Sequence, residues 1–192
     1  MKIIKSIENG TIYNVLLIIS FSFFIVILLW FITFKANKFD HIIHNYQILN
    51  KMTIFERFKY ELIPFKFNNP YIDGKKEFIY NMLIFSPFGI YLPLLLKKEN
   101  IIRDLIICFL ISLILELIQL FTLIGGFSTN DLIANTIGYF IGYIFYITII
   151  KYLKKEIKIL LMFILISILI PFIIYILINT ITNLDIYIYK EY

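Results

Sequence analysis

Five long apolar runs, separated by short polar breaks, constrain this chain more than any other feature of its sequence. They cover residues 12–34, 78–96, 105–124, 132–150 and 157–178. Each run is close to the length of about 20 residues that an α-helix needs to cross the hydrocarbon core of a bilayer. Backbone polar groups inside a bilayer must be satisfied within their own segment, which a helix achieves. We therefore predict an all-α, polytopic membrane protein with five transmembrane helices.

The composition supports this fold class and excludes several others. Apolar residues make up 60% of the 192 residues and charged residues only 16%, whereas about a quarter of a soluble domain is charged. Five spans leave too little chain for a soluble catalytic domain, so we predict a single membrane domain over residues 1–192. The one cysteine, Cys108, lies inside an apolar run, which excludes a disulfide framework and a thiolate metal cluster. Basic residues stand in short groups beside the runs, which favours contact with membrane lipids over nucleic acid.

The distribution of lysine and arginine predicts the orientation in the membrane. With five spans, the N-terminus and the breaks after the second and fourth runs lie on one side, which carries nine of these cations. The other side also carries nine, but eight of them share the long loop between the first two runs. The positive-inside rule is most reliable for short connections, and these agree. We predict that the N-terminus lies inside and the C-terminus outside.

The long loop contains an apolar stripe with helical spacing. Seven apolar residues recur at intervals of three and four between residues 42 and 62, and Pro64 follows them. This pattern predicts an amphipathic helix over residues 42–62, which we expect to lie in the outer membrane interface. His41 and His44 stand nearby with one carboxylate, Asp40. This set is too small for a metal site, so we interpret both as interfacial histidines and predict no metal.

Six polar residues inside the runs require an explanation, because a charged side chain at the centre of a membrane helix costs roughly 2.5–3.5 kcal/mol. The second run contributes one, the third contributes three on one helical face, and the fourth contributes two that are four positions apart. At 1.5 Å per residue, all of them lie in the same half of the bilayer. We expect them to line one outward-facing polar pocket: Asn81; Ser112, Glu116 and Gln119; Asp131 and Asn135.

A stripe of small residues follows the polar residues of the fourth run. Ala134, Gly138 and Gly142 are four positions apart, and such a stripe lets two membrane helices approach closely. We expect the close contact to be with the third run, so that the polar residues are held against it. The alternative to a pocket is a polar clamp, a set of hydrogen bonds that only holds the helices together. Such a clamp does not require two acidic residues.

Four blocks of these residues resemble the VanZ-like family of small bacterial integral membrane proteins. The blocks keep the family's order and spacing across residues 57–142. They are Leu62-Ile63-Pro64-Phe65 with Arg57 or Lys59 upstream; Asn81, Phe85, Pro87 and Gly89; Ser112, Glu116 and Gln119; and Asp131, Asn135, Gly138 and Gly142.

The family usually has an arginine before Asp131, whereas this chain has none there, and Arg57 or Lys59 is the candidate to replace it. The resemblance implies a multi-pass protein of the bacterial cell membrane, with a cytoplasmic N-terminus in the orientation above. It also implies reduced susceptibility to teicoplanin-type glycopeptide antibiotics.

Two functions from different classes stay open. The first is a non-enzymatic cell-envelope protein whose pocket binds a head-group-bearing molecule, such as a lipid-linked cell-wall precursor or a lipoglycopeptide. The second is a membrane enzyme that acts on a lipid-linked phosphate or glycosyl bond, with Glu116 and Asp131 as candidate catalytic acid and base. The sequence contains no Gly-rich phosphate loop and no Ser–His or Cys–His pairing. We therefore predict no cofactor and prefer the first function.

Overall fold

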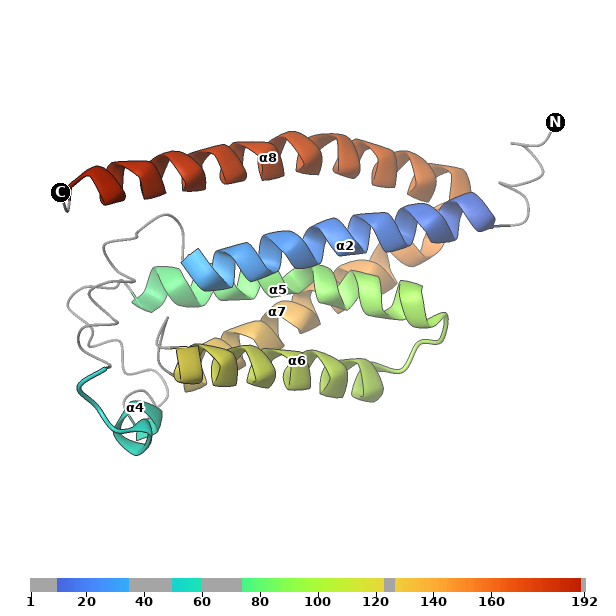
Figure 1. Ribbon diagram of the computed structural model, residues 1–192. Helices are drawn as coiled ribbons and strands as arrows, with labels where there is room; N and C mark the ends of the chain where they lie inside the picture. The colour runs from blue at the N-terminus through green and yellow to red at the C-terminus, as the bar shows by residue number, and fades with distance from the viewer. Residues whose placement is uncertain (1–9, 35–49, 60–73, 123–126, 191–192) are drawn as a thin grey trace. The chain divides into compact units, whose positions relative to one another are not determined.

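The computed structural model describes residues 10–34, 50–59, 74–122 and 127–190, and the regular secondary structure in these segments is helical (Figure 1). Five helices are long and apolar enough to cross a membrane. The all-α fold with five spanning helices is thus confirmed. They are α2 (Thr11–Phe34), α5 (Gly74–Leu96), α6 (Ile101–Thr122), α7 (Thr129–Thr148) and α8 (Lys155–Lys190). The 3₁₀ helix η1 (Ile150–Tyr152) follows α7, and the short helix α4 (Ile54–Lys59) precedes α5.

The spanning helices differ from the predicted ranges at their ends, most of all at the starts of α5 and α6 and at the end of α8. Helix α5 begins at Gly74 rather than at residue 78, and its first turn takes in Lys75, Lys76 and Glu77. Helix α8 extends over Lys155–Lys190, beyond both ends of the predicted run. Apolar sequence marks the part of a helix that lies in hydrocarbon, whereas backbone hydrogen bonding continues into polar flanks. Apolar runs therefore located these helices but not their ends.

The predicted amphipathic helix is only partly within the described segments. Residues 42–49 and 60–62 lie outside them, residues 50–53 are not helical, and α4 begins at Ile54. A capping box explains this start: the Thr53 N–H donates to Glu56 Oε2 at 2.8 Å, and Thr53 Oγ1 accepts from the Glu56 N–H at 3.3 Å. The hydrogen bonds that Glu56 Oε2 accepts from the Thr53 N–H and from the Thr53 hydroxyl, in that order, lower the pKa of Glu56. A position in the membrane interface stays a prediction.

The chain divides into two compact units. One comprises residues 1–39 and 153–192, in which α2 contacts α8. The other comprises residues 40–152 and contains α4, α5, α6, α7 and η1. The single domain over residues 1–192 stays a prediction, and all candidate site residues fall in the second unit.

Helix α7 is the centre of the second unit, because it contacts both α5 and α6. Helix α5 runs parallel to it: a Cβ atom built on Gly138 would meet the Met82 carbonyl, and one built on Gly142 would meet the Ser86 carbonyl. Helix α6 runs antiparallel, because Ser112 pairs with Asn135 and Glu116 with Ser128. The end of α6 and the starts of α5 and α7 therefore lie at the same end of this unit.

Two prolines inside α5 are compatible with a membrane helix because neighbouring groups compensate for them. Pro87 has no N–H to donate to the Leu83 carbonyl. The Ser86 hydroxyl donates to that carbonyl instead, at 2.8 Å. Side-chain hydroxyls commonly satisfy backbone groups freed by proline in membranes. Helix α5 thus remains continuous through Pro87 and presents Ser86 and Gly89 to α7.

Candidate functional site

Buried polar side chains follow one face of α6. Ser112, Glu116 and Gln119 are 1%, 4% and 4% exposed, although neighbours such as Ile114 and Ile118 are half exposed. A membrane helix turns its ionisable residues toward the protein interior, because lipid cannot solvate them. The polar face of α6 is therefore the face that is covered by protein.

Ser128 joins Glu116 to the start of α7. It is the N-cap residue of that helix, and its Oγ accepts a hydrogen bond from the Asp131 N–H at 3.2 Å. Its own N–H donates to Glu116 Oε2 at 2.8 Å. The free N–H groups and dipole of a helix N-terminus favour negative charge, so both the Glu116 and Asp131 carboxylates occupy a position that stabilises them.

A second pair connects the two helices one turn deeper. Asn135 Nδ2 donates to Ser112 Oγ at 2.8 Å, and the two residues are 4% and 1% exposed. The other polar atom of this amide, Asn135 Oδ1, is buried and has no hydrogen-bond partner among the described residues. Asn135 therefore retains an acceptor for a further donor. We call Ser112, Glu116, Ser128, Asp131 and Asn135 the α6–α7 polar site.

The remaining predicted pocket residues lie on α4, α5 and α6. Asn81 is half-buried on α5 next to Met82, whose carbonyl faces Gly138. Gln119 is buried on α6, one turn beyond Glu116. Arg57 and Lys59 belong to α4, but their side chains lie outside the described part of the chain. The structure therefore joins Ser112 to Asn135 and Glu116 to the start of α7, and within the described segments it shows no hydrogen bond from Asn81 to these residues.

The small-residue stripe of α7 faces α5, so the expected contact with the third run is wrong. Gly138 and Gly142 lie against the carbonyls of Met82 and Ser86, and Gly89 of α5 lies against the Tyr139 carbonyl. Successive residues of a helix are rotated by about 100°. Asn135 and Gly138 are therefore about 60° apart around the helix axis, and in the structure the first contacts α6 and the second contacts α5.

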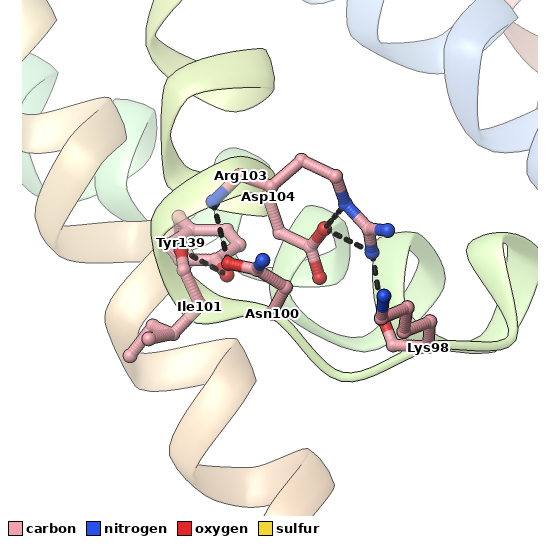
Figure 2. Close-up of polar contacts among 6 residues, drawn as sticks. All are labelled: Lys98, Asn100, Ile101, Arg103, Asp104 and Tyr139. Atoms are coloured by element: carbon pink, nitrogen blue, oxygen red, sulfur yellow. Dashed lines mark hydrogen bonds and ion pairs between the residues drawn. The ribbon is translucent and has the colours of Figure 1, made fainter.

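A second polar cluster lies at the opposite end of α6 (Figure 2), and the sequence analysis missed it. Arg103 Nε and Nη2 both contact Asp104 Oδ1, at 2.8 Å and 2.7 Å, and Nη2 also donates to the Lys98 carbonyl at 2.6 Å. The Asp104 side chain is fully buried, and its Oδ2 has no hydrogen-bond partner among the described residues. The Tyr139 hydroxyl donates to the Ile101 carbonyl at 3.4 Å.

The signal for this cluster was the four-residue spacing between Asp104 and Cys108. The third apolar run begins at Leu105, which leaves Asp104 outside it. In the structure α6 starts at Ile101, and both Asp104 and Cys108 are buried. Tyr139 lies within the fourth apolar run, and the run itself gives no sign of its hydroxyl group.

An exposed contact lies near the same end of the unit. Glu99 accepts hydrogen bonds from Lys151 Nζ at 2.8 Å and from the Tyr146 hydroxyl at 3.2 Å. The hydrogen bond from Lys151 lowers the pKa of Glu99. The connection between α5 and α6 is thereby attached to the end of α7.

Within the described segments, no three His, Cys, Asp or Glu side chains gather as a metal site would require. His41 and His44 lie outside those segments. Four described carboxylates instead have partners that are backbone N–H groups, arginine or lysine: Glu56, Glu99, Asp104 and Glu116.

Comparison with known proteins decides the family. The family model VanZ/LLP1 matches residues 21–153. The chain belongs to the VanZ/LLP1 family. The match contains the complete helices α5, α6 and α7 and begins within α2, so it extends beyond residues 57–142, over which the motifs were recognised. Helix α8 follows it.

The chain is also similar in sequence to a curated protein. Protein VanZ of Enterococcus faecium is 30% identical to this chain over 119 residues. The aligned region covers 62% of this chain and 66% of that protein, which is just under two thirds. No solved structure matches the chain. The α6–α7 polar site lies inside the region that the VanZ/LLP1 model matches.

Proposed function

We propose that this VanZ/LLP1 protein works in the bacterial cell membrane, where its α6–α7 polar site binds an envelope molecule and lowers susceptibility to teicoplanin-type glycopeptide antibiotics. One observation supports the proposal most strongly. The Glu116 carboxylate accepts a hydrogen bond from the N-cap Ser128, whose hydroxyl binds the backbone N–H of a second buried acid, Asp131, and one turn deeper a buried amide oxygen of Asn135 has no partner among the described residues.

The energetics favour a binding site over a polar clamp. An interhelical hydrogen bond in a membrane contributes about 0.6 kcal/mol on average, which the Asn135–Ser112 bond already supplies. A charged residue inside a membrane helix costs roughly 2.5–3.5 kcal/mol. Helix packing alone therefore gives no reason for two acids, whereas a site that binds a polar ligand requires such groups.

The chemistry of the site indicates the class of ligand. Carboxylate and amide oxygens accept hydrogen bonds from hydroxyl and amide N–H groups. A lipid-linked cell-wall precursor and a lipoglycopeptide both carry such donors on a polar head group, together with an apolar tail. Membrane lipids surround the exposed apolar residues of α5 and α6. Asn81 and Gln119 extend the proposed site, and Arg57 or Lys59 is the candidate for a positive charge near it.

The proposed orientation places the site at the outer surface. The short connections after α5 and α7 carry Lys97, Lys98, Lys151 and Lys154, which favours a cytoplasmic location. A cysteine introduced at Thr129 should then react with a membrane-impermeant reagent in intact cells, whereas one introduced at Lys98 should not. Both are made in a Cys108→Ser background, and the reverse labelling pattern would invert the orientation.

The function is tested by expression in a susceptible Gram-positive host. The full-length protein should raise the inhibitory concentration of a teicoplanin-type antibiotic, and extracted envelope lipids should co-purify with it. Ser167→Ala on α8 is a control, because this residue is exposed and its hydroxyl bonds only the Phe163 carbonyl. If the wild-type protein neither raises tolerance nor binds extracted envelope lipid, the proposal is wrong.

The second candidate is a membrane enzyme that acts on a lipid-linked phosphate or glycosyl bond. The observation that favours it is that two buried acids lie near the start of α7: the Glu116 carboxylate accepts from the Ser128 N–H, and Asp131 occupies the first turn of the helix. Carboxylates in different surroundings can divide the acid and base roles. Glu116→Gln distinguishes the functions, because glutamine keeps the shape but cannot transfer a proton. Enzymatic activity predicts complete loss of tolerance at unchanged abundance, whereas binding predicts partial retention.

A further inference from the structure

The polar face of α6 continues through most of the membrane span. Asp104, Cys108, Ser112 and Glu116 recur every four positions, and their exposed fractions are 0%, 0%, 1% and 4%. Residues four apart lie above one another on a helix. The path from Asp104 to Glu116 is about 18 Å at 1.5 Å per residue, which is more than half of a hydrocarbon core of about 30 Å.

Helix α7 carries a matching series. Asp131, Asn135 and Tyr139 are also four positions apart and are 5%, 4% and 0% exposed. The two series are connected at several depths: Glu116 contacts the N-cap of α7, Ser112 contacts Asn135, and the Tyr139 hydroxyl contacts the first turn of α6 (Figure 2). We call these seven residues of α6 and α7 the α6–α7 seam.

Two oxygens on the seam have no hydrogen-bond partner among the described residues, Asp104 Oδ2 and Asn135 Oδ1. Arg103 directs both of its donors to Asp104 Oδ1, so Oδ2 stays an acceptor. A buried acceptor without a donor costs about 1–3 kcal/mol. Packing of α6 against α7 gives no reason for this unfavourable free energy. A carboxylate that takes up and releases a proton, in contrast, needs an oxygen without a fixed donor.

We propose that the α6–α7 seam is a proton pathway whose end groups are the carboxylates of Asp104 and Glu116. Ionisable residues on the inner faces of membrane helices mark proton relays in pumps and transporters. The Ser112 hydroxyl and the Cys108 thiol lie between the ends, and the Tyr139 hydroxyl contacts the first turn of α6 at the Asp104 end. Each of these three groups is both a donor and an acceptor. Water that enters the seam joins them when the helices separate slightly.

The proton transfer is balanced without a co-reactant. A proton binds to one terminal carboxylate, each intermediate group releases one proton as it receives another, and a proton leaves from the carboxylate at the other end. Only O–H and S–H bonds change, and the proton gradient supplies the driving force. Arg103 balances the charge of Asp104 when that carboxylate is deprotonated. Other titratable groups that face the pathway are Asp131 at the Glu116 end and Tyr143, whose ring stacks on Tyr139.

Proton flux through the full-length protein tests this inference. The purified protein is reconstituted into vesicles of phosphatidylcholine and phosphatidylglycerol that contain a pH-sensitive dye, and a potassium gradient with valinomycin drives proton entry. Wild-type vesicles should acidify several-fold faster than protein-free vesicles. Asp104→Asn and Glu116→Gln should each reduce the rate to that of protein-free vesicles. Glu156→Gln, an exposed residue at the start of α8, should keep the wild-type rate.

Two substitutions at Cys108 distinguish a loss of proton transfer from a folding defect. Serine keeps a group that relays protons, so Cys108→Ser should retain the flux. Valine is similar in size but has no exchangeable proton, so Cys108→Val should abolish the proton flux while the protein elutes unchanged from a sizing column.

The inference is overturned if wild-type and protein-free vesicles acidify equally, or if Cys108→Val and Glu116→Gln both keep the wild-type rate. Antibiotic tolerance without flux would overturn this inference alone, and flux without tolerance would overturn only the proposed function.

Discussion

The two faces of α7 are built from different chemistry although they share one helix. Toward α5, Gly138 and Gly142 bring backbone against backbone, with no polar side chain between them. Toward α6, Asn135 and the N-cap Ser128 form hydrogen bonds with buried polar side chains. The face toward α5 depends on residues that have no side chain, whereas the face toward α6 depends on particular hydrogen-bond donors and acceptors. A substitution can therefore affect packing or function separately, according to the face on which it lies.

The largest expected effect is on the α5 face. Gly142→Leu places a side chain where the Ser86 carbonyl lies, and Gly138→Leu does the same at Met82. Overfilling a packed interface costs about 1–3 kcal/mol or more, so both variants should lower the midpoint of thermal unfolding in detergent. Thr148→Leu, at an exposed position of α7, is the matched control. Unchanged midpoints for both glycine variants would show that α5 and α7 are not closely packed.

A smaller effect is expected on the α6 face. Ser112→Ala and Asn135→Ala each remove one partner of a buried hydrogen bond. A double-mutant cycle on the free energy of unfolding should give a coupling energy of about 0.6 kcal/mol, the average for such bonds in membranes. The corresponding cycle between Ser112→Ala and Ser167→Ala should give none. A coupling energy of zero for the first pair would mean that the two side chains do not meet.

The smallest effect is expected at the exposed Glu99–Lys151 contact. The hydrogen bond from Lys151 lowers the pKa of Glu99 in the folded protein. The stabilisation is therefore present above the ordinary pKa of glutamate and is lost as the pH falls through the lower, folded-state value. Screening by water makes the contribution of such an exposed pair small. Unfolding curves of wild-type protein and Glu99→Gln should differ slightly at neutral pH and coincide in acid, and a difference that grows in acid would contradict the assignment.

The sequence was most informative about features that depend on one helix alone. Apolar runs locate the five helices, because hydrocarbon requires both apolar side chains and satisfied backbone groups. The spacing of Ser112 and Glu116 places them on one face of α6, and that of Asp131 and Asn135 does the same on α7. The depth argument then predicted that the candidates of these two helices lie at one level, and in the structure Ser112 is hydrogen-bonded to Asn135 and Glu116 to Ser128 at the start of α7.

What the sequence did not reveal depends on contacts between helices. Spacing puts Gly138 and Gly142 on one face but does not say which helix packs there, and the contact with α5 was missed. Ser128 acts partly through its backbone N–H, and a backbone group has no sequence signature of its own. Asp104 was overlooked because charge at the end of an apolar run usually marks the membrane surface, whereas α6 begins early enough to bury it.

The central claim is that the α6 face of α7 carries the function, and one measurement tests it most directly. It is the inhibitory concentration of a teicoplanin-type antibiotic for a Gram-positive host that produces Asn135→Phe at the same membrane abundance as the wild-type protein. Phenylalanine fills the space beside Ser112 and removes both polar atoms of the amide. We predict that tolerance is lost, whereas Ser167→Phe on α8 keeps it. Full tolerance with Asn135→Phe at equal abundance would contradict the claim.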